Sequence, residues 1–213
     1  MKQILVYGDS LSWGIIPGTR QRLTFEKRWP GVLETSINKG GSKVRVIENC
    51  LNGRRTVWDD PFKTGRNGLQ GLPQLMEIHS PLDLVILMLG TNDFQAVHNN
   101  FAPQAPQGVA AVIQAIRTAP IEPGMPVPPI LLVAPPPILR PTGPMQDKFV
   151  DAEKKCLGLA EKFAALSREL SCYFFDSGTV IVTSSVDGVH LDAGGHLALG
   201  QALVPEVEAI LLR

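Results

Sequence analysis

The segment from Leu84 to Leu89 contains six consecutive apolar residues without a polar residue among them. A strand with one face in water alternates apolar and polar residues, whereas a strand that is buried on both faces does not. Strands of the second kind occur almost only in parallel sheets that carry helices on both sides. This segment therefore predicts the central strand of such a sheet, and it constrains the fold more than any other segment.

Four shorter runs rich in branched apolar residues have the lengths of further strands. They are residues 4–7, 44–48, 130–133 and 173–175. Segments with helical periodicity separate them, as expected of βα units. Apolar residues recur every three or four positions over 149–170, and a second helix is expected over 193–212 with Asp192 as its N-cap. The sequence predicts a three-layer α/β/α sandwich with a five-stranded parallel sheet of flavodoxin-like arrangement.

Length and loop composition indicate one domain. A chain of 213 residues fits a single domain, and no repeat, charge run or linker divides the predicted sheet. Ten of the 18 prolines lie between Pro120 and Pro144, around the fourth predicted strand, where they must form loops of restricted shape. We expect residues 1–213 to form one domain, with these loops at the rim of the site or at a contact between subunits.

Charge and cysteine content disfavour several classes of function. Twenty Lys and Arg balance twenty Asp and Glu, so no overall field would attract nucleic acid or anionic lipid. No apolar run approaches the roughly 20 residues that span a bilayer, and the apolar stretch before Gly8 is too short for a signal peptide. The three cysteines match neither a disulfide framework nor a zinc motif. We expect a cytoplasmic protein that uses no metal or cofactor and binds neither nucleic acid nor membrane.

Reactive side chains follow four of the five predicted strands, at the sheet edge where ligands of open parallel sheets bind. Ser10 lies at the turn into the first helix, where free backbone N–H groups can face a developing negative charge. A serine nucleophile needs an imidazole base, and the spacing of Asp187 and His190 lets the carboxylate fix the ring tautomer. Gly53 and Asn92 follow the second and third strands and can donate N–H groups. We predict Ser10, His190 and Asp187 as catalytic, and Ser10, Gly53 and Asn92 as the oxyanion hole.

Each of these residues also has an ordinary structural interpretation. A serine at a helix start is more often an N-cap, a glycine after a strand can serve only a positive φ angle, and Asn92 could brace its own loop. Only their combination indicates catalysis. Asp9 and Asp93, beside the catalytic positions, are expected to accept hydrogen bonds from their loops, and His196 is expected to pack within the last helix or face solvent.

The four segments occur in the order that is typical of the SGNH, or GDSL, hydrolase superfamily, which the sequence resembles over nearly its whole length. They are Gly8-Asp9-Ser10-Leu11, Gly53, Gly90-Thr91-Asn92-Asp93 and Asp187-Gly188-Val189-His190. Three further segments resemble the bacterial arylesterase and acyltransferase branch: Ser12-Trp13-Gly14, residues 28–33 and residues 47–56. The resemblance implies hydrolysis of small esters, acyl transfer to alcohols and a compact homo-oligomer, for which an octamer is one expectation. Many members carry Gly-Asp where this chain has Gly53-Arg54, which leaves the substrate contacts open.

The substrate pocket is less well defined by the sequence. Five aromatic residues fall near the four segments and could line it, although aromatic residues often pack in the core instead: Trp13, Phe25, Trp29, Phe94 and Phe101. Arg54 and Arg55 could bind an anionic part of a substrate, or could form ion pairs within the fold or between subunits.

Rival functions lack their motifs. An ordinary α/β-hydrolase needs G-x-S-x-G, but Ser12 stands where the second glycine belongs. Neither glycine-rich phosphate motif of nucleotide-binding folds is present. An inert binding scaffold would keep the fold without turnover, and the complete catalytic set argues against it. The sequence predicts a serine esterase for small aryl or short-chain acyl esters. A thioesterase, a lysophospholipase or a carbohydrate acetylesterase of the same superfamily stays open.

Overall fold

Five parallel strands in the order β2-β1-β3-β4-β5 form the sheet of the computed structural model, which describes residues 1–212. Their bounds are β1 Lys2–Gly8, β2 Val44–Cys50, β3 Leu84–Met88, β4 Ile130–Ala134 and β5 Tyr173–Asp176. The apolar segment that begins at Leu84 forms β3, which lies in the middle of the sheet with all of its residues buried. The predicted five-stranded parallel sheet is confirmed.

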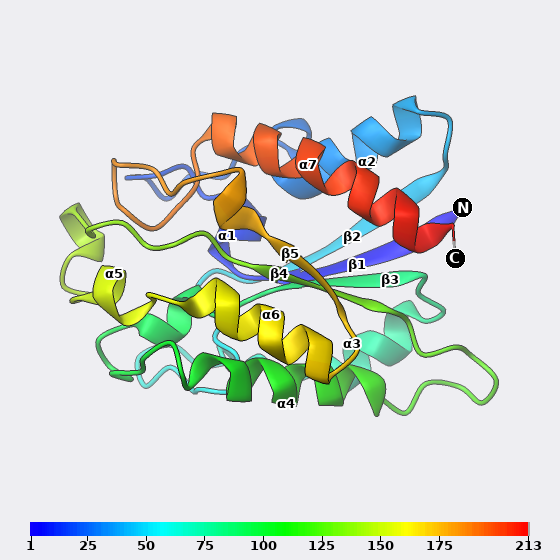
Figure 1. Ribbon diagram of the computed structural model, residues 1–213, viewed down its shortest axis with the longest axis horizontal. Helices are drawn as coiled ribbons and strands as arrows, with labels where there is room; N and C mark the ends of the chain where they lie inside the picture. The colour runs from blue at the N-terminus through cyan, green and yellow to red at the C-terminus, as the bar shows by residue number, and fades with distance from the viewer. Residues whose placement is uncertain (213) are drawn as a thin grey trace.

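Helices cover both faces of the sheet, with α2 and α7 on one side and α3, α4 and α6 on the other (Figure 1). The α-helices are α1 Ser10–Trp13, α2 Trp29–Lys39, α3 Leu72–His79, α4 Ala105–Arg117, α5 Ala152–Lys155, α6 Leu159–Glu169 and α7 Ala193–Leu211. Short 3-10 turns are η1 Phe25–Lys27, η2 Thr91–Phe94, η3 Gly143–Met145 and η4 Ser177–Thr179.

Alternate residues of each central strand feed two separate apolar cores. In β1, Leu5 and Tyr7 pack with α3, α4 and α6, whereas Ile4 and Val6 pack with α2 and α7. Successive side chains of a strand point to opposite faces, so a strand between two helical layers needs apolar residues at every position. This requirement explains the lack of alternation in the sequence and confirms the three-layer sandwich.

The helix expected over residues 149–170 is wrong in one respect, because it is divided into α5 and α6. Gly158 precedes α6 with a φ of 80°, a left-handed conformation that breaks the helix. The apolar periodicity survives because both pieces bury the same side, through Ala152 and Cys156 in α5 and its C-cap and Phe163 in α6. The last helix was expected correctly, and Asp192 caps α7 by accepting a hydrogen bond from Gly195 N at 2.7 Å.

α2 and α7 pack unusually closely. A Cβ atom on Gly200 of α7 would lie 2.6 Å from Cβ of Val32 in α2, so only glycine fits there. One turn away, Nδ1 of the fully buried His196 accepts a hydrogen bond from Trp29 N at 3.2 Å, which caps the first turn of α2. His196 therefore packs inside the protein, and the two helices form one unit.

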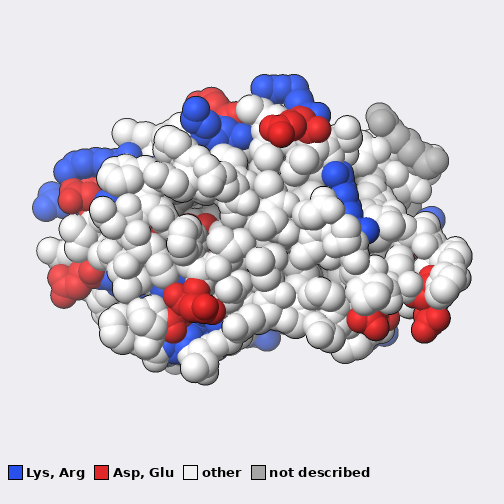
Figure 2. Space-filling view, turned by 90° about the horizontal axis from the view of Figure 1, so that it is seen from below, with Lys and Arg blue, Asp and Glu red and all other residues white. Residues whose placement is uncertain are grey.

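The opposite helical layer carries charges of both signs. On the face seen in Figure 2, Lys and Arg lie among Asp and Glu toward the edges, around a broad uncharged middle. Within residues 1–212, no helix combines the length and the apolar character that crossing a membrane requires.

Candidate active site

Loops at the carboxyl ends of the strands bring the five predicted site residues together. Ser10 begins α1 directly after β1, Gly53 follows β2, and Asn92 lies in η2 after β3. Asp187 and His190 lie in the loop between η4 and α7. Ser10, Gly53, Asn92 and His190 all line one cavity of about 190 Å³. Its size suits a small substrate.

Ser10, His190 and Asp187 form a continuous line of hydrogen bonds. Nε2 of His190 lies 3.1 Å from Oγ of Ser10, and Nδ1 lies 2.8 Å from Oδ2 of Asp187. The other carboxylate oxygen accepts hydrogen bonds from the backbone N–H groups of Val189 at 3.0 Å and His190 at 2.9 Å. A carboxylate on Nδ1 leaves Nε2 as the acceptor, so the ring can take the proton of Ser10.

Asp187 is held in its charged form. Burial alone would raise the pKa of this carboxyl, but hydrogen bonds from the ring and backbone of His190 outweigh burial and lower it well below its usual range. Gly18 N donates a further hydrogen bond to Oδ2 at 3.2 Å. The carboxylate therefore remains an acceptor that can stabilise an imidazolium.

The proline-rich loop after β4 supports the Asp187 turn. Leu139 N donates to Gly188 O at 2.9 Å, and Thr142 N donates to Asp187 O at 3.2 Å. Gly188 has a φ of 78°, and a Cβ atom there would lie 2.5 Å from the carbonyl oxygen of Arg140. This part of the proline-rich region lies beside the site, which agrees with the expectation that these loops form its rim.

Three residues with free N–H donors line the cavity at Ser10. The Ser10 N–H belongs to the first residue of α1, where no intrahelical acceptor exists. The Gly53 N–H makes no hydrogen bond within the described chain, and Gly53 adopts a φ of 80° that favours glycine. The Asn92 amide spends one N–H on Asp9 Oδ2 at 2.9 Å, so its second N–H is left for a ligand. Unpaired N–H donors of this kind are what an oxyanion hole requires, so the predicted role of these residues is part of the proposed function.

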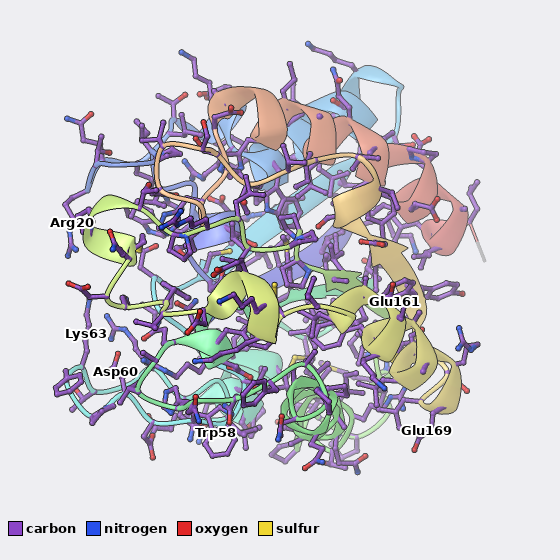
Figure 3. The ribbon with its side chains drawn as sticks, turned by 60° about the vertical axis from the view of Figure 1, so that its left-hand side comes forward. Arg20, Trp58, Asp60, Lys63, Glu161 and Glu169 are labelled. Carbon is purple, nitrogen blue, oxygen red and sulfur yellow. The ribbon has the colours of Figure 1, made fainter. Side chains whose placement is uncertain are left out.

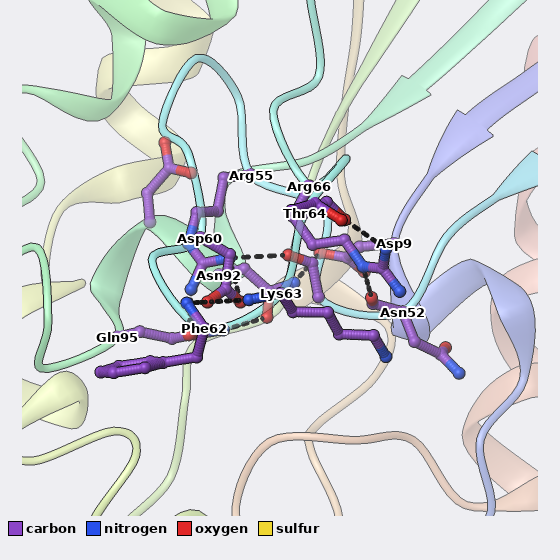
Figure 4. A network of polar contacts seen from close by, with 12 residues as sticks. Asp9, Asn52, Arg55, Asp60, Phe62, Lys63, Thr64, Arg66, Asn92 and Gln95 are labelled. Carbon is purple, nitrogen blue, oxygen red and sulfur yellow. Dashed lines mark hydrogen bonds and ion pairs between the residues drawn. The ribbon is translucent and has the colours of Figure 1, made fainter. Parts of the chain in front are cut away.

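The orientation of the Asn92 amide is fixed from both sides. Gln95 Nε2 donates to Asn92 Oδ1 at 2.7 Å, and Gln95 Oε1 accepts a hydrogen bond from Arg55 Nη2. Arg55 is almost fully buried and forms an ion pair with Asp60 at 2.8 Å. Figure 4 shows this chain of contacts from Asp60 to Asn92. The sequence did not single out Gln95 or Asp60, because neither belongs to a recognisable motif.

The two acidic neighbours of the site brace loops, as predicted. Asp9 Oδ1 accepts Leu11 N at 2.9 Å and caps α1, and Asp93 Oδ1 accepts Thr56 N at 2.9 Å. Burial raises the pKa of Asp9 to about 6, against the opposing hydrogen bonds. Burial likewise raises the pKa of Asp93 to about 6. Both carboxyl groups thus serve as structural acceptors beside the reacting groups.

The predicted aromatic lining of the pocket is wrong. Trp29 and Phe94 are fully buried in the two opposite cores. Trp13 lies beneath the guanidinium of Arg22, and Phe25 beneath that of Arg28. Phe101 lines a different hollow, with Ala96 and Val150. Burial stabilises large apolar side chains more than small ones. An aromatic residue that is close in sequence to Ser10 or Asn92 can therefore pack in a core instead of lining the cavity.

Arg54 does not reach the pocket either. Its guanidinium donates to Gly8 O at 2.9 Å and to Asn49 Oδ1 at 2.7 Å, and it lies 4.0 Å from the ring centre of Tyr7. Arg54 therefore ties β1 to β2, and Arg55 pairs with Asp60 within the fold. The pocket is lined instead by side chains that the sequence did not indicate: Ile15, Arg20, Asn52, Asp60, Lys63, Met145, Lys148 and Phe149.

A model of the GDSL-like lipase/acylhydrolase family matches residues 6–198, a stretch that contains all five residues of the site. The chain belongs to this family. The resemblance predicted from the sequence is confirmed, and with it the class of enzyme, a hydrolase of carboxylic esters. The chain belongs to the family although the aromatic residues that were expected in the pocket do not line it.

Among the proteins similar to the chain are two with solved structures and one curated relative. An aryl esterase of M. smegmatis, solved with an inhibitor, is 35% identical with a TM-score of 0.93, covering 99% of this chain and 100% of that one. A carbohydrate acetylesterase family member from Sinorhizobium meliloti is 36% identical with a TM-score of 0.93, covering 100% of both chains. An arylesterase of Vibrio mimicus is 38% identical over 92 residues, which span 43% of this chain and only 38% of that relative.

Proposed function

We propose that this GDSL-family chain is a serine esterase that hydrolyses small aryl or short-chain acyl esters through an acyl-enzyme at Ser10. The observation that carries the proposal is the hydrogen-bonded line from Ser10 through His190 to Asp187, beside three residues of the same cavity that have free N–H donors. Neither a lone N-cap serine nor an inert scaffold requires this combination.

In the proposed reaction, His190 Nε2 takes the Ser10 proton as Oγ attacks the ester carbonyl carbon. The N–H groups of Ser10 and Gly53 and the Asn92 amide receive the tetrahedral oxyanion. His190 then protonates the leaving alcohol oxygen, which gives an acyl-enzyme. Water, deprotonated by the same ring, then attacks the acyl carbon; the bond to Ser10 Oγ breaks, the ring returns its proton to Oγ, and the acid is released. Asp187 stabilises the imidazolium in both steps.

The experiment is active-site labelling with a fluorophosphonate, together with burst kinetics on 4-nitrophenyl acetate. Ser10→Ala should lose both the label and the burst. Ser12→Ala is a matched control, because Oγ of this equally buried serine faces Met88 Sδ at 3.9 Å rather than His190. A stoichiometric burst from Ser10→Ala would remove Ser10 from the role of nucleophile.

Acyl transfer to small alcohols is a second proposed activity. The aromatic lining that motivated it is absent, but Ile15, Met145 and Phe149 give the cavity an apolar wall. Such a wall favours an alcohol over water at the acyl-enzyme by about 0.8 kcal/mol per buried CH2. Vinyl acetate with dilute benzyl alcohol should therefore give benzyl acetate in addition to acetic acid. Free acid alone, over several alcohols, would leave a plain hydrolase.

Assembly and location are also part of the proposal. A homo-oligomer, with an octamer as the specific expectation, is supported by the resemblance to oligomeric acyltransferases, and sedimentation at micromolar concentration tests it. Residence in the cytoplasm is supported by three cysteines that are all free thiols. Cell fractionation with a specific antibody tests the location.

A further inference from the structure

Three positively charged side chains line the cavity that contains Ser10 and His190. They are Arg20, Lys63 and Lys148, which come from three separate loops: before α2, between β2 and α3, and before α5. Arg20 and Lys63 lie on the same edge of the molecule in Figure 3. Loops that are far apart in the sequence thus bring cations to one pocket, although the whole chain has a formal net charge of zero.

These three charges are not neutralised by the protein. None of them forms an ion pair within residues 1–212. Asp60 is the one acidic side chain on the described walls of the cavity, and it already pairs with Arg55 at 2.8 Å. Asp60 Oδ1 also accepts hydrogen bonds from Phe62 N and Lys63 N, so both of its oxygens are engaged. On the walls of this cavity the three positive side chains therefore face no unpaired carboxylate.

The cations are close enough to influence one another. Displacement of water by the surrounding protein lowers the pKa of Lys148, and the positive charges of Arg55, Lys63 and Arg20 lower it further, while Asp60 opposes them. Like charges that are held close together repel one another, and this repulsion opposes folding. A negatively charged ligand between them would remove this repulsion.

We propose that Arg20, Lys63 and Lys148 form an anion-binding rim, and that the preferred substrates are esters carrying one additional negatively charged group such as a carboxylate. This inference rests on the proposed esterase function and adds the substrate class to it. An arginine fork can bind a carboxylate through two hydrogen bonds, and the lysines act as point charges that attract it. Attraction by exposed charges of this kind weakens as salt is added.

The test compares neutral and anionic esters in matched pairs. Phenyl acetate is paired with 4-acetoxybenzoate, and 4-nitrophenyl butyrate with the mono-4-nitrophenyl ester of succinic acid, so that the charge lies on either side of the ester bond. Each kcat/KM is divided by the rate of hydrolysis of that ester by hydroxide, which removes differences in intrinsic reactivity. We expect the anionic member of at least one pair to be favoured, and 0.5 M NaCl to reduce the preference.

Three substitutions locate the effect: Arg20→Gln, Lys63→Gln and Lys148→Gln, with Lys39→Gln at the end of α2 as the matched control. Each rim variant should lower kcat/KM for the favoured anionic ester by about 2-fold to 5-fold, as expected of exposed charge pairs. The neutral partner ester should change by less than that. Lys39→Gln should leave both values unchanged.

A binding measurement separates failure of the rim from failure of the esterase. Benzoate should bind the wild-type protein more tightly than the triple rim variant in calorimetry, whereas benzyl alcohol should not distinguish the two proteins. Equal binding of benzoate, or equal use of neutral and anionic esters by an active enzyme, would overturn the rim and leave the esterase intact. Benzoate selectivity without hydrolysis of any ester or fluorophosphonate labelling would instead overturn the proposed function.

Discussion

Replacing His196 by Asn should make the protein less sensitive to acid. His196 is fully buried in α7, and its Nδ1 accepts the N–H of Trp29. Burial lowers the pKa of this ring to about 4; the negative charge of Asp192 opposes this shift and the positive charge of Arg28 reinforces it. An asparagine places its Oδ1 close to the position of Nδ1, so His196→Asn retains an acceptor for Trp29 and removes the titrating group.

The size of the effect follows from the difference between the folded and unfolded pKa of this ring. The unfolded ring titrates near 6.5, so between pH 6.5 and 4 the unfolded chain binds a proton that the folded chain excludes. The stability contributed by the neutral ring is present above pH 6.5 and is lost as the pH falls toward 4. At pH 4.5 the loss is about 2 to 3 kcal/mol, whereas at pH 7 it is close to zero. The variant should therefore gain about 2 kcal/mol relative to wild type between these two pH values.

Urea unfolding followed by tryptophan fluorescence at pH 7 and pH 4.5 measures this gain. The difference between variant and wild type cancels the other titrating groups, including Asp9 and Asp93, whose raised pKa values favour the folded state as the pH falls. His79→Asn, at the end of α3, is the control for removal of a histidine. If His196→Asn and His79→Asn shift equally between the two pH values, the buried neutral ring does not explain the acid sensitivity.

Three further predictions concern the site and the helix pair beside it. Asn92→Ala should lower kcat by about 100-fold to 1,000-fold with little change in KM, because an oxyanion donor acts mainly in the transition state. Steady-state kinetics on 4-nitrophenyl acetate measures both constants, and a rise in KM alone would contradict the prediction. Gln95→Met should lower kcat by about 10-fold at similar KM, since the Asn92 amide loses the hydrogen bond that orients it. The surface substitution Gln70→Met is the control. An unchanged kcat in Gln95→Met would show that Asp9 alone orients the amide. Gly200→Ala should cost about 1–3 kcal/mol of unfolding free energy in urea, because the added methyl meets Val32. Gly195→Ala is the control, because a Cβ atom on this glycine of the same helix comes no closer than 3.5 Å to its neighbours; equal losses in the two variants would rule out the steric explanation.

The sheet could be predicted because burial on both faces leaves a direct record in the sequence. Neighbouring residues of a central strand, such as Leu5 and Val6, pack in opposite cores. Every position of such a strand must therefore be apolar, which explains the unbroken apolar run in β3. The helix break at Gly158 was not predicted, since apolar periodicity continues across it and glycine is tolerated within helices. Periodicity thus reports which side is buried, and not whether the backbone is continuous.

The clustering of Ser10, Asn92 and His190 could be predicted from the sequence, whereas the rest of the pocket lining could not. Ser10, Asn92 and His190 belong to local segments at the ends of strands, so topology alone brings them together. The direction of a nearby aromatic side chain depends on tertiary packing, and Trp29 and Phe94 turned into the cores. The cations of the rim come from three loops without a shared pattern, which only the folded structure can relate.

The close contact of α2 with α7 affects when the protein can fold during its synthesis. Ser10, the proposed nucleophile, is synthesised 180 residues before His190, the proposed base, and α7 follows His190. A nascent chain that ends before Asp187 carries neither base nor carboxylate. One that ends before α7 leaves the sheet uncovered where Leu199, Leu203 and Val207 belong. Ester hydrolysis at Ser10 is therefore expected only after α7 has been synthesised and has packed against α2.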